Sequence, residues 1–136
     1  MNQHLLQVKH NERFHQSIET QFADQFYDWK VTVLFYVAIH CLQTLAAQKG
    51  INIGNSHYEI ENNINPDRHN AKMRITKGAW RQYKNLMEYS RTSRYEGVTD
   101  FATFEKIRKL DHSYCLIHLD NFKKYISSQG VTFLVK

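Results

Sequence analysis

The longest apolar stretch of this chain is the feature that most constrains its fold. It runs from Val31 to Ala47, inside a helical pattern that spans about residues 28–50. Its apolar side chains cover most of the circumference of a helix, so other elements have to surround it. We therefore expect the central helix of a bundle here. The stretch is also too short and too polar to cross a bilayer, because polar residues interrupt it. These residues are Thr32, His40, Gln43 and Thr44.

The segments on either side also have the 3.6-residue apolar period of helices, and the chain contains a single proline. We predict long helices at about residues 3–22 and 76–96, and a last one that begins after a cap at Thr99 or Asp100 and continues to about Ser128. The buried face of the last helix is predicted to contain Phe101, Phe104, Ile107, Asp111, Tyr114, His118, Phe122 and Tyr125.

A short helix is predicted between the second and third long helices. Ser56 and Glu59 have the spacing of a capping box, and the helix should end near Ile64. Four long helices with short connections predict an all-α, antiparallel four-helix up-and-down bundle. We expect one domain over residues 1–136, with residues 130–136 as an extended tail that a subunit contact could cover.

Composition restricts the partners and the location. The net charge of +5 and the eight histidines favour polyanionic partners. Cys41 and Cys115 lie in apolar helical segments, which is typical of buried thiols in a reducing compartment. Because no secretory signal is visible at the start of the sequence, we expect a cytoplasmic protein. The common phosphate-loop, dinucleotide and zinc-ligand motifs are absent, so we expect neither a metal nor a cofactor.

Two histidines are candidates for acid–base chemistry. His40 shares a helical stripe with Tyr36, where it is either a general acid or base or a hydrogen-bonded core residue. His57 lies in the first turn of the short helix, whose free N–H groups favour a phosphate oxygen. The alternative for His57 is a solvent-exposed histidine without a role.

Several cations are candidates for binding phosphate. Arg91 and Arg94 are predicted to lie on one face at the end of the third long helix, where an anion such as Glu88 or a bound phosphate has to balance them. The segment after the short helix forms a basic loop that could follow a phosphate backbone. Its cations are Arg68, Lys72 and Arg74. A weaker candidate pair, one helical turn apart, is Arg108 and His112.

The motifs of this sequence resemble those of small stand-alone bacterial and archaeal HEPN domains. The resemblance rests on Phe35-Tyr36 followed by His40, on Ser56-His57, and on Ser90-Arg91 with Arg94-Tyr95. It implies a helical bundle that commonly dimerises. Many such proteins are metal-independent endoribonucleases of toxin–antitoxin or phage-defence systems, and others are non-catalytic partners of small nucleotidyltransferases. The residues that match the family motif are His40, His57, Arg91, Arg94 and Tyr95.

Two functions follow from this resemblance. The first is RNA or nucleotide-phosphate binding, extending to metal-independent RNA cleavage with His40 or His57 as acid and base and Tyr95 as an orienting donor. The arginine–histidine spacing usual in the nucleases is absent, since Arg108 and His112 are one residue too close. The second function is a non-catalytic subunit that binds a nucleotidyltransferase or an antitoxin. A homodimer is expected in either case.

Overall fold

The computed structural model describes residues 3–91 and 100–134 of the chain. Within these ranges the protein consists of helices and contains no strand. The all-α class and the short helix between the second and third long helices are confirmed. The helices are α1 (Gln3–Gln21), α2 (Tyr27–Gln48), α3 (His57–Ile64), α4 (Lys77–Ser90) and α5 (Phe101–Ser128).

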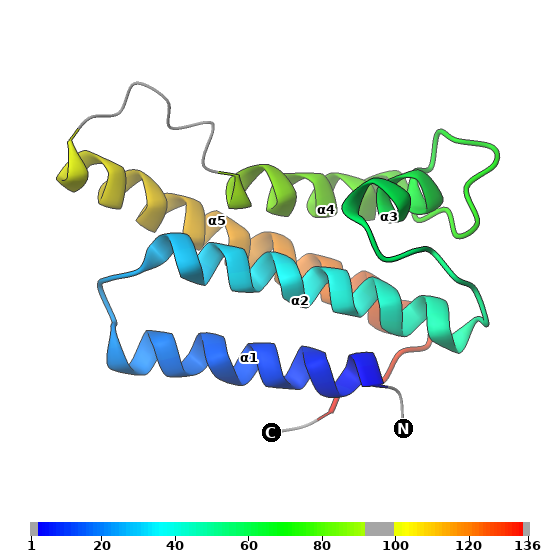
Figure 1. Cartoon of the computed structure of the whole chain (residues 1–136), viewed down its shortest axis with the longest axis horizontal. Coiled ribbons are helices and arrows are strands. Elements are labelled where there is room, and N and C mark those ends of the chain that lie inside the picture. Colours follow the sequence, from blue (N-terminus) through cyan, green and yellow to red (C-terminus); the bar gives the residue numbers. More distant parts are fainter. Residues whose placement is uncertain (1–2, 92–99, 135–136) are drawn as a thin grey trace.

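Helix α2 is the core of the bundle, as its sequence predicts. It packs against α1, α4 and α5, whereas α1 lies at the outside against α2 (Figure 1). Val31, Val37 and Leu42 of α2 are fully buried. Among the described residues, α2 is also the one helix long and apolar enough to cross a membrane by length and composition, but two thirds of its most apolar window is buried inside the bundle.

The long helices alternate in direction along the chain. In Figure 1, α1 and α4 run one way, while α2 and α5 run the other way and lie between them. This arrangement places the end of α1 and the start of α2 near the first half of α5. It also places α3 and the segment after it against α4, at the other end of α2.

The short helix α3 begins with the predicted capping box. The Ser56 hydroxyl accepts a hydrogen bond from the Glu59 N–H at 3.1 Å, and the Glu59 carboxylate accepts one from the Ser56 N–H at 3.4 Å. Gly54 precedes the cap with a φ of +91°, and a Cβ there would lie 2.5 Å from Cβ of Glu59. The turn into α3 therefore requires glycine at this position.

The segment between α3 and α4 consists of turns and bends, and its last residues, 72–76, alternate between the solvent and the core. The Met73 N–H donates to the Asn63 carbonyl at 2.8 Å, and the Ile75 N–H donates to the Ile64 carbonyl at 3.0 Å. These bonds hold Met73 and Ile75 in the core, so the side chains between and before them face outward.

One prediction about the helices is wrong, and another is right only in part. Helix α4 ends at Ser90 rather than continuing to residue 96, because Arg91 has an extended backbone with a ψ of 136°. On α5, Asp111 and Phe122 of the predicted face are buried, but Phe101 and Tyr114 are exposed. The first turns of α5 project past the end of α4 (Figure 1). The buried residues of α5 are Arg108, Asp111, His112, Cys115, Leu119, Phe122 and Ile126.

The remaining expectations concern the cysteines and the tail. Cys41 and Cys115 are buried free thiols, and burial raises the pKa of Cys41 to about 12. The described part of the tail is not helical and packs on its own bundle. Val131 is buried, and Phe133 lies against the core with Nζ of Lys123 4.6 Å from its ring. Residues 135–136 lie outside the described part.

Candidate functional site

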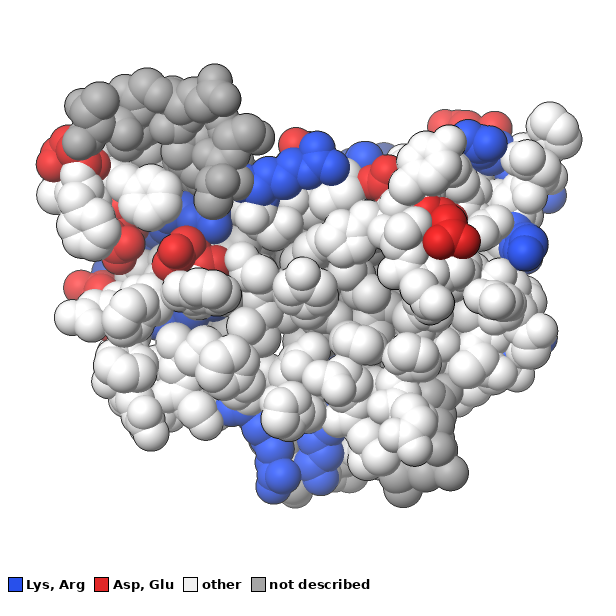
Figure 2. All heavy atoms as spheres, viewed as in Figure 1, with Lys and Arg blue, Asp and Glu red and all other residues white. Residues whose placement is uncertain are grey.

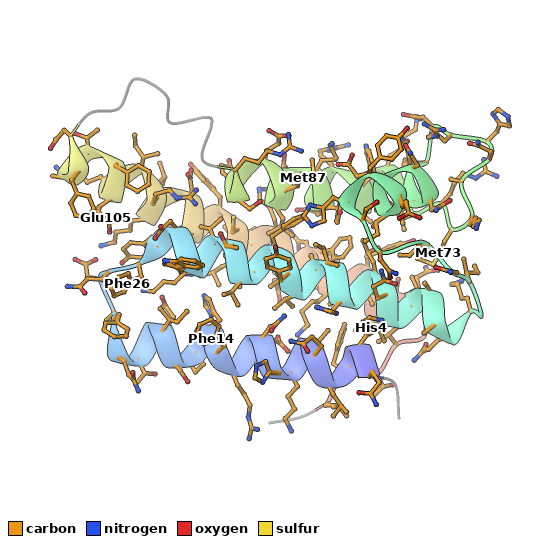
Figure 3. All side chains as sticks on the ribbon, in the orientation of Figure 1. His4, Phe14, Phe26, Met73, Met87 and Glu105 are labelled. Carbon is orange, nitrogen blue, oxygen red and sulfur yellow. The ribbon has the colours of Figure 1, made fainter. Side chains whose placement is uncertain are left out.

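His40 lies on α2 and faces α1 rather than a cation. Its Nδ1 is 3.0 Å from Nδ1 of His4, so one ring donates a hydrogen bond to the other. Partial burial lowers the pKa of both imidazoles, and the neighbouring His4 lowers that of His40 further. Both rings are therefore mainly neutral near pH 7. Figure 3 shows the side chains of His4 and Phe14 in the layer between α1 and α2.

A shallow groove of about 330 Å³ runs beside His40. Its wall is formed by α1 and α2, and its lining contains neither lysine nor arginine among the described residues. The lining residues are Gln7, Asn11, Phe14, Trp29, Thr32, Val33, Tyr36 and His40.

His57 is exposed in the first turn of α3 and leans on α2. Its ring centroid is 5.6 Å from that of Phe35, edge to face, and 6.4 Å from that of Tyr36. Tyr36 is one helical turn from His40. The structure thus places both predicted histidines near Tyr36: His57 lies against its ring, and His40 lines the same groove as Tyr36.

The predicted arginine clamp is not formed as expected. Arg91 follows the last residue of α4, and its Nη1 lies 3.7 Å from the Glu88 carboxylate in an exposed ion pair. In the described part of the chain, Arg91 shares no hydrogen bond or ion pair with His40 or His57. Arg94 and Tyr95 lie outside the described residues.

The predicted pair Arg108 and His112 is wrong as a phosphate site. Arg108 is fully buried, and its Nη1 donates to the Tyr89 carbonyl at 2.6 Å. Asp111 lies 3.7 Å from the same guanidinium nitrogen. His112 is buried as well. Both side chains lie on the inner face of α5, where a polyanion has no access.

His112 instead belongs to a cluster with two residues of α1. Its Nε2 is 2.9 Å from Nε2 of His15 and 3.9 Å from a carboxylate oxygen of Glu19. Burial and the neighbouring His15 lower the pKa of His112 to about 4, so the ring is neutral at pH 7. Sequence reasoning missed this cluster, although the i, i+4 spacing of His15 and Glu19 puts them on one helical face.

Lys30 supports this cluster from the core. Its Nζ is 2.8 Å from the Glu19 carboxylate and 2.8 Å from the Phe22 carbonyl. Burial alone would raise the pKa of Glu19, but Lys30 and then His112 bring it below the usual value. Glu19 is therefore ionised at neutral pH.

The basic segment, residues 68–84, contains the highest density of cations in the chain. It has six lysines and arginines, and the first carboxylate after it is Glu88. Arg68, Lys72 and Arg74 are exposed, as the sequence predicts. Lys84 is only partly exposed and forms an ion pair, in which its Nζ lies 2.9 Å from the Glu61 carboxylate. The remaining exposed cations of the segment are Lys77 and Arg81.

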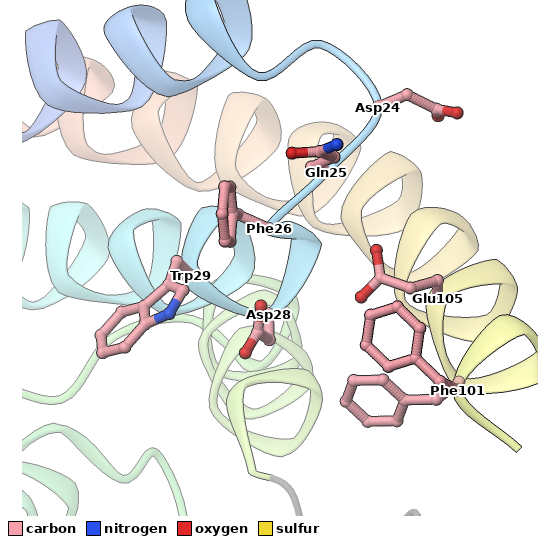
Figure 4. A pocket seen from close by; sticks show the side chains of 8 residues that line it. Asp24, Gln25, Phe26, Asp28, Trp29, Phe101 and Glu105 are labelled. Carbon is pink, nitrogen blue, oxygen red and sulfur yellow. The ribbon is translucent and has the colours of Figure 1, made fainter.

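A cavity of about 550 Å³ is lined by acidic rather than basic residues. It lies where the turn before α2 meets the start of α5 (Figure 4). Carboxylates of Asp24, Asp28 and Glu105 line it, and burial followed by the other two carboxylates raises the pKa of Glu105. Its aromatic walls come from Phe26, Trp29, Phe101 and Phe104. A cavity with three carboxylates disfavours phosphate.

The surface of α1 and α2 is neither basic nor acidic. Figure 2 shows few charged side chains over this face, and after Lys30 the sequence of α2 contains no lysine, arginine, aspartate or glutamate. Large aromatic side chains are exposed there instead. This aromatic face comprises Phe14, Phe22, Phe26, Trp29 and Tyr36.

Comparisons with known proteins give no independent indication of function. The chain matches no protein-family model, and no curated protein or solved structure is significantly similar to it.

Proposed function

We propose that this protein is a HEPN-like domain that binds the phosphates of RNA or of a nucleotide through its basic segment. The observation that carries the proposal is the run of six cations without a carboxylate in residues 68–84. Five of these cations are exposed, so phosphate can reach them. The antiparallel up-and-down order of the HEPN family is part of the proposal, and the alternating helix directions support it.

The local backbone strengthens the positive potential of this segment. Met73 and Ile75 anchor the end of this segment in the core, which fixes Lys72 and Arg74 on the solvent side. Helix α4 begins directly afterwards, and its N-terminal N–H groups carry a partial positive charge. Lys77 and Arg81, one turn apart, continue the basic surface along α4.

Binding of this kind depends on salt, because each neutralised phosphate releases counterions. We expect labelled single-stranded RNA to bind with a strong salt dependence, measured by fluorescence anisotropy over a range of salt concentrations. Replacing both Lys72 and Arg74 by alanine should weaken binding roughly tenfold or more and reduce the salt slope by about two. The matched control is Lys9→Ala with Arg13→Ala on α1, which removes two cations from another helix.

An unchanged salt slope in the Lys72 and Arg74 variant would overturn the proposal, as would an equal loss of affinity in the control.

RNA cleavage is a separate question. The groove beside His40 has no lysine or arginine among its described lining residues to stabilise a phosphorane. Our proposal is therefore binding without turnover. Incubation with RNA in EDTA tests this directly, and products that disappear in His57→Ala would replace it with the nuclease function.

A specific observation favours a second candidate function, that of a non-catalytic subunit. The aromatic face on α1 and α2 is large and nearly free of charge, as protein interfaces often are. A small nucleotidyltransferase, an antitoxin or a second copy of this chain would bind there. Co-purification of a stable complex from a protein without RNA affinity would favour this function.

A further inference from the structure

We propose that His15, Glu19 and His112 form a zinc site that fastens α1 to α5. The donor atoms of the three side chains lie within 4.8 Å of one another. Two imidazoles and one carboxylate are a donor set that Zn²⁺ adopts in proteins, with a fourth position left for water. This proposal does not depend on RNA binding.

The distances require little rearrangement. Two nitrogen ligands of a tetrahedral zinc ion are about 3.3 Å apart, given bonds of roughly 2.0–2.1 Å. Nε2 of His15 and Nε2 of His112 are 2.9 Å apart, so the pair has to open by only about 0.4 Å. Both nitrogens already point at one location, because a hydrogen bond joins them.

The elements that carry the ligands hold them in place. His15 and Glu19 are four residues apart on α1 and therefore share a face, and the inner face of α5 presents His112 to them. His112 is buried, while His15 and Glu19 are partly exposed. An ion can thus enter from the solvent side and be held against the core.

Lys30 is a cation in contact with the cluster, and it binds the Glu19 carboxylate. It binds Oε1 of Glu19, the same oxygen that lies 3.9 Å from Nε2 of His112, and also the Phe22 carbonyl. A carboxylate oxygen has two lone pairs, so a metal ion would share Oε1 with the ammonium group. A hydrogen-bonded partner of this kind orients a ligating carboxylate. The ammonium group also opposes the added positive charge, which favours a hydroxide or an anion at the fourth position.

The site would attach α1 to a second helix of the bundle. Helix α1 packs on α2, and its links to α5 are isolated side-chain contacts such as the ion pair between Lys123 and Glu12. A metal ion shared by α1 and α5 would therefore protect α1 from local opening.

Zinc binding to the chelator-treated protein tests the proposal. We expect isothermal titration with Zn²⁺ to give one tight site per chain. The side chain of His15 is partly exposed, so His15→Ala leaves no buried cavity. The affinity of this variant for Zn²⁺ should fall by more than roughly a hundredfold, because loss of a residue that only supports a ligand already costs up to that much. His10→Ala is the matched control, since His10 is an exposed histidine of the same helix.

Hydrogen exchange supplies a second measurement. Zn²⁺ should slow the exchange of α1 amides in the wild type and in His10→Ala, but not in His15→Ala. Absence of a tight site in the wild type would overturn the proposal. So would a site that persists in His15→Ala, or one that is lost in His4→Ala, which would place the metal at the His4 and His40 pair.

Discussion

At the scale of single residues, the described part of the chain contains charged groups in its interior that are held by specific partners. Lys30 is 0% exposed, and its ammonium group is bonded to the Glu19 carboxylate and to the carbonyl at the end of α1. It also lies 4.4 Å from the ring of Tyr27. Lys30 thus joins the end of α1, the following turn and α2 at one point. Such a group stabilises the fold only while all its partners remain.

Replacing Lys30 by methionine should destabilise the protein strongly. The change keeps the unbranched apolar stem of the side chain but leaves the Glu19 carboxylate and the Phe22 carbonyl without their donor. Loss of one partner of a buried pair costs about 3–5 kcal/mol, and we expect the lower part of that range because Glu19 is partly exposed to water. Urea unfolding measures the free energy. The control is Lys124→Met, whose exposed pair with Asp120 contributes at most about 1 kcal/mol. Equal unfolding midpoints for the two variants would contradict the prediction.

At the scale of elements, α1 is attached to the bundle by two histidine pairs. His4 contacts His40 near its start, and His15 contacts His112 further along. In each pair a ring nitrogen of one imidazole donates the hydrogen bond and a ring nitrogen of the other accepts it. The accepting imidazole must stay neutral, so a second added proton would break the bond and leave two positive rings that repel each other. The attachment of α1 therefore weakens when both rings of a pair are protonated.

Lowering the pH should destabilise the protein. The pKa values of His4, His40 and His112 are depressed in the folded state, that of His112 to about 4, against about 6.5 in the unfolded chain. Below pH 6.5 the unfolded state then binds more protons, so the stabilisation is complete above about pH 7.5 and declines as the pH falls. We expect Tm, followed by circular dichroism in EDTA, to drop by several degrees between pH 7.5 and pH 5.

The variant His4→Gln tests the contribution of one pair. It removes the neighbouring imidazole that depresses the pKa of His40, so Tm should depend less on pH than in the wild type. His69→Gln is the control, because His69 is exposed in the basic segment. A steeper decline of Tm in His4→Gln than in the control would show that the pair does not weaken on protonation.

At the scale of the whole molecule, the sequence predicted the features that depend on neighbouring residues, but not the contacts between residues far apart in the chain. The apolar periodicity gave the central position of α2, and the spacing of Ser56 and Glu59 gave the start of α3, since both depend on neighbouring residues. The buried face of α5 depends on where α4 ends, and the His15–His112 contact joins residues far apart in the chain. No periodicity encodes such information. The contact of His57 with Phe35 and Tyr36 depends on the packing of α3 on α2, which the motif alone did not specify.

The three kinds of surface are also placed differently at this scale. The basic segment lies after α3 and along α4. The acidic cavity adjoins the aromatic face on α1 and α2, since Phe26 and Trp29 belong to both. A two-fold interface brings the same patch of each copy together, so a charged patch would repel itself. The nearly uncharged aromatic face is therefore the surface best suited to a contact between two copies of this chain.

A homodimer formed through this face should dissociate when a charge is placed in it. Trp29 is 60% exposed at the centre of the groove between α1 and α2, so Trp29→Glu should not disturb the core. The two-fold axis would bring the new carboxylates near each other in an interface that excludes water, and we expect the dimer Kd to rise by more than about tenfold. Sedimentation equilibrium measures this constant. Tyr58→Glu introduces the same charge at an exposed aromatic residue of α3 and should leave the dimer intact. If the wild type is a monomer, or if Tyr58→Glu dissociates the dimer while Trp29→Glu does not, the aromatic face is not the contact between copies.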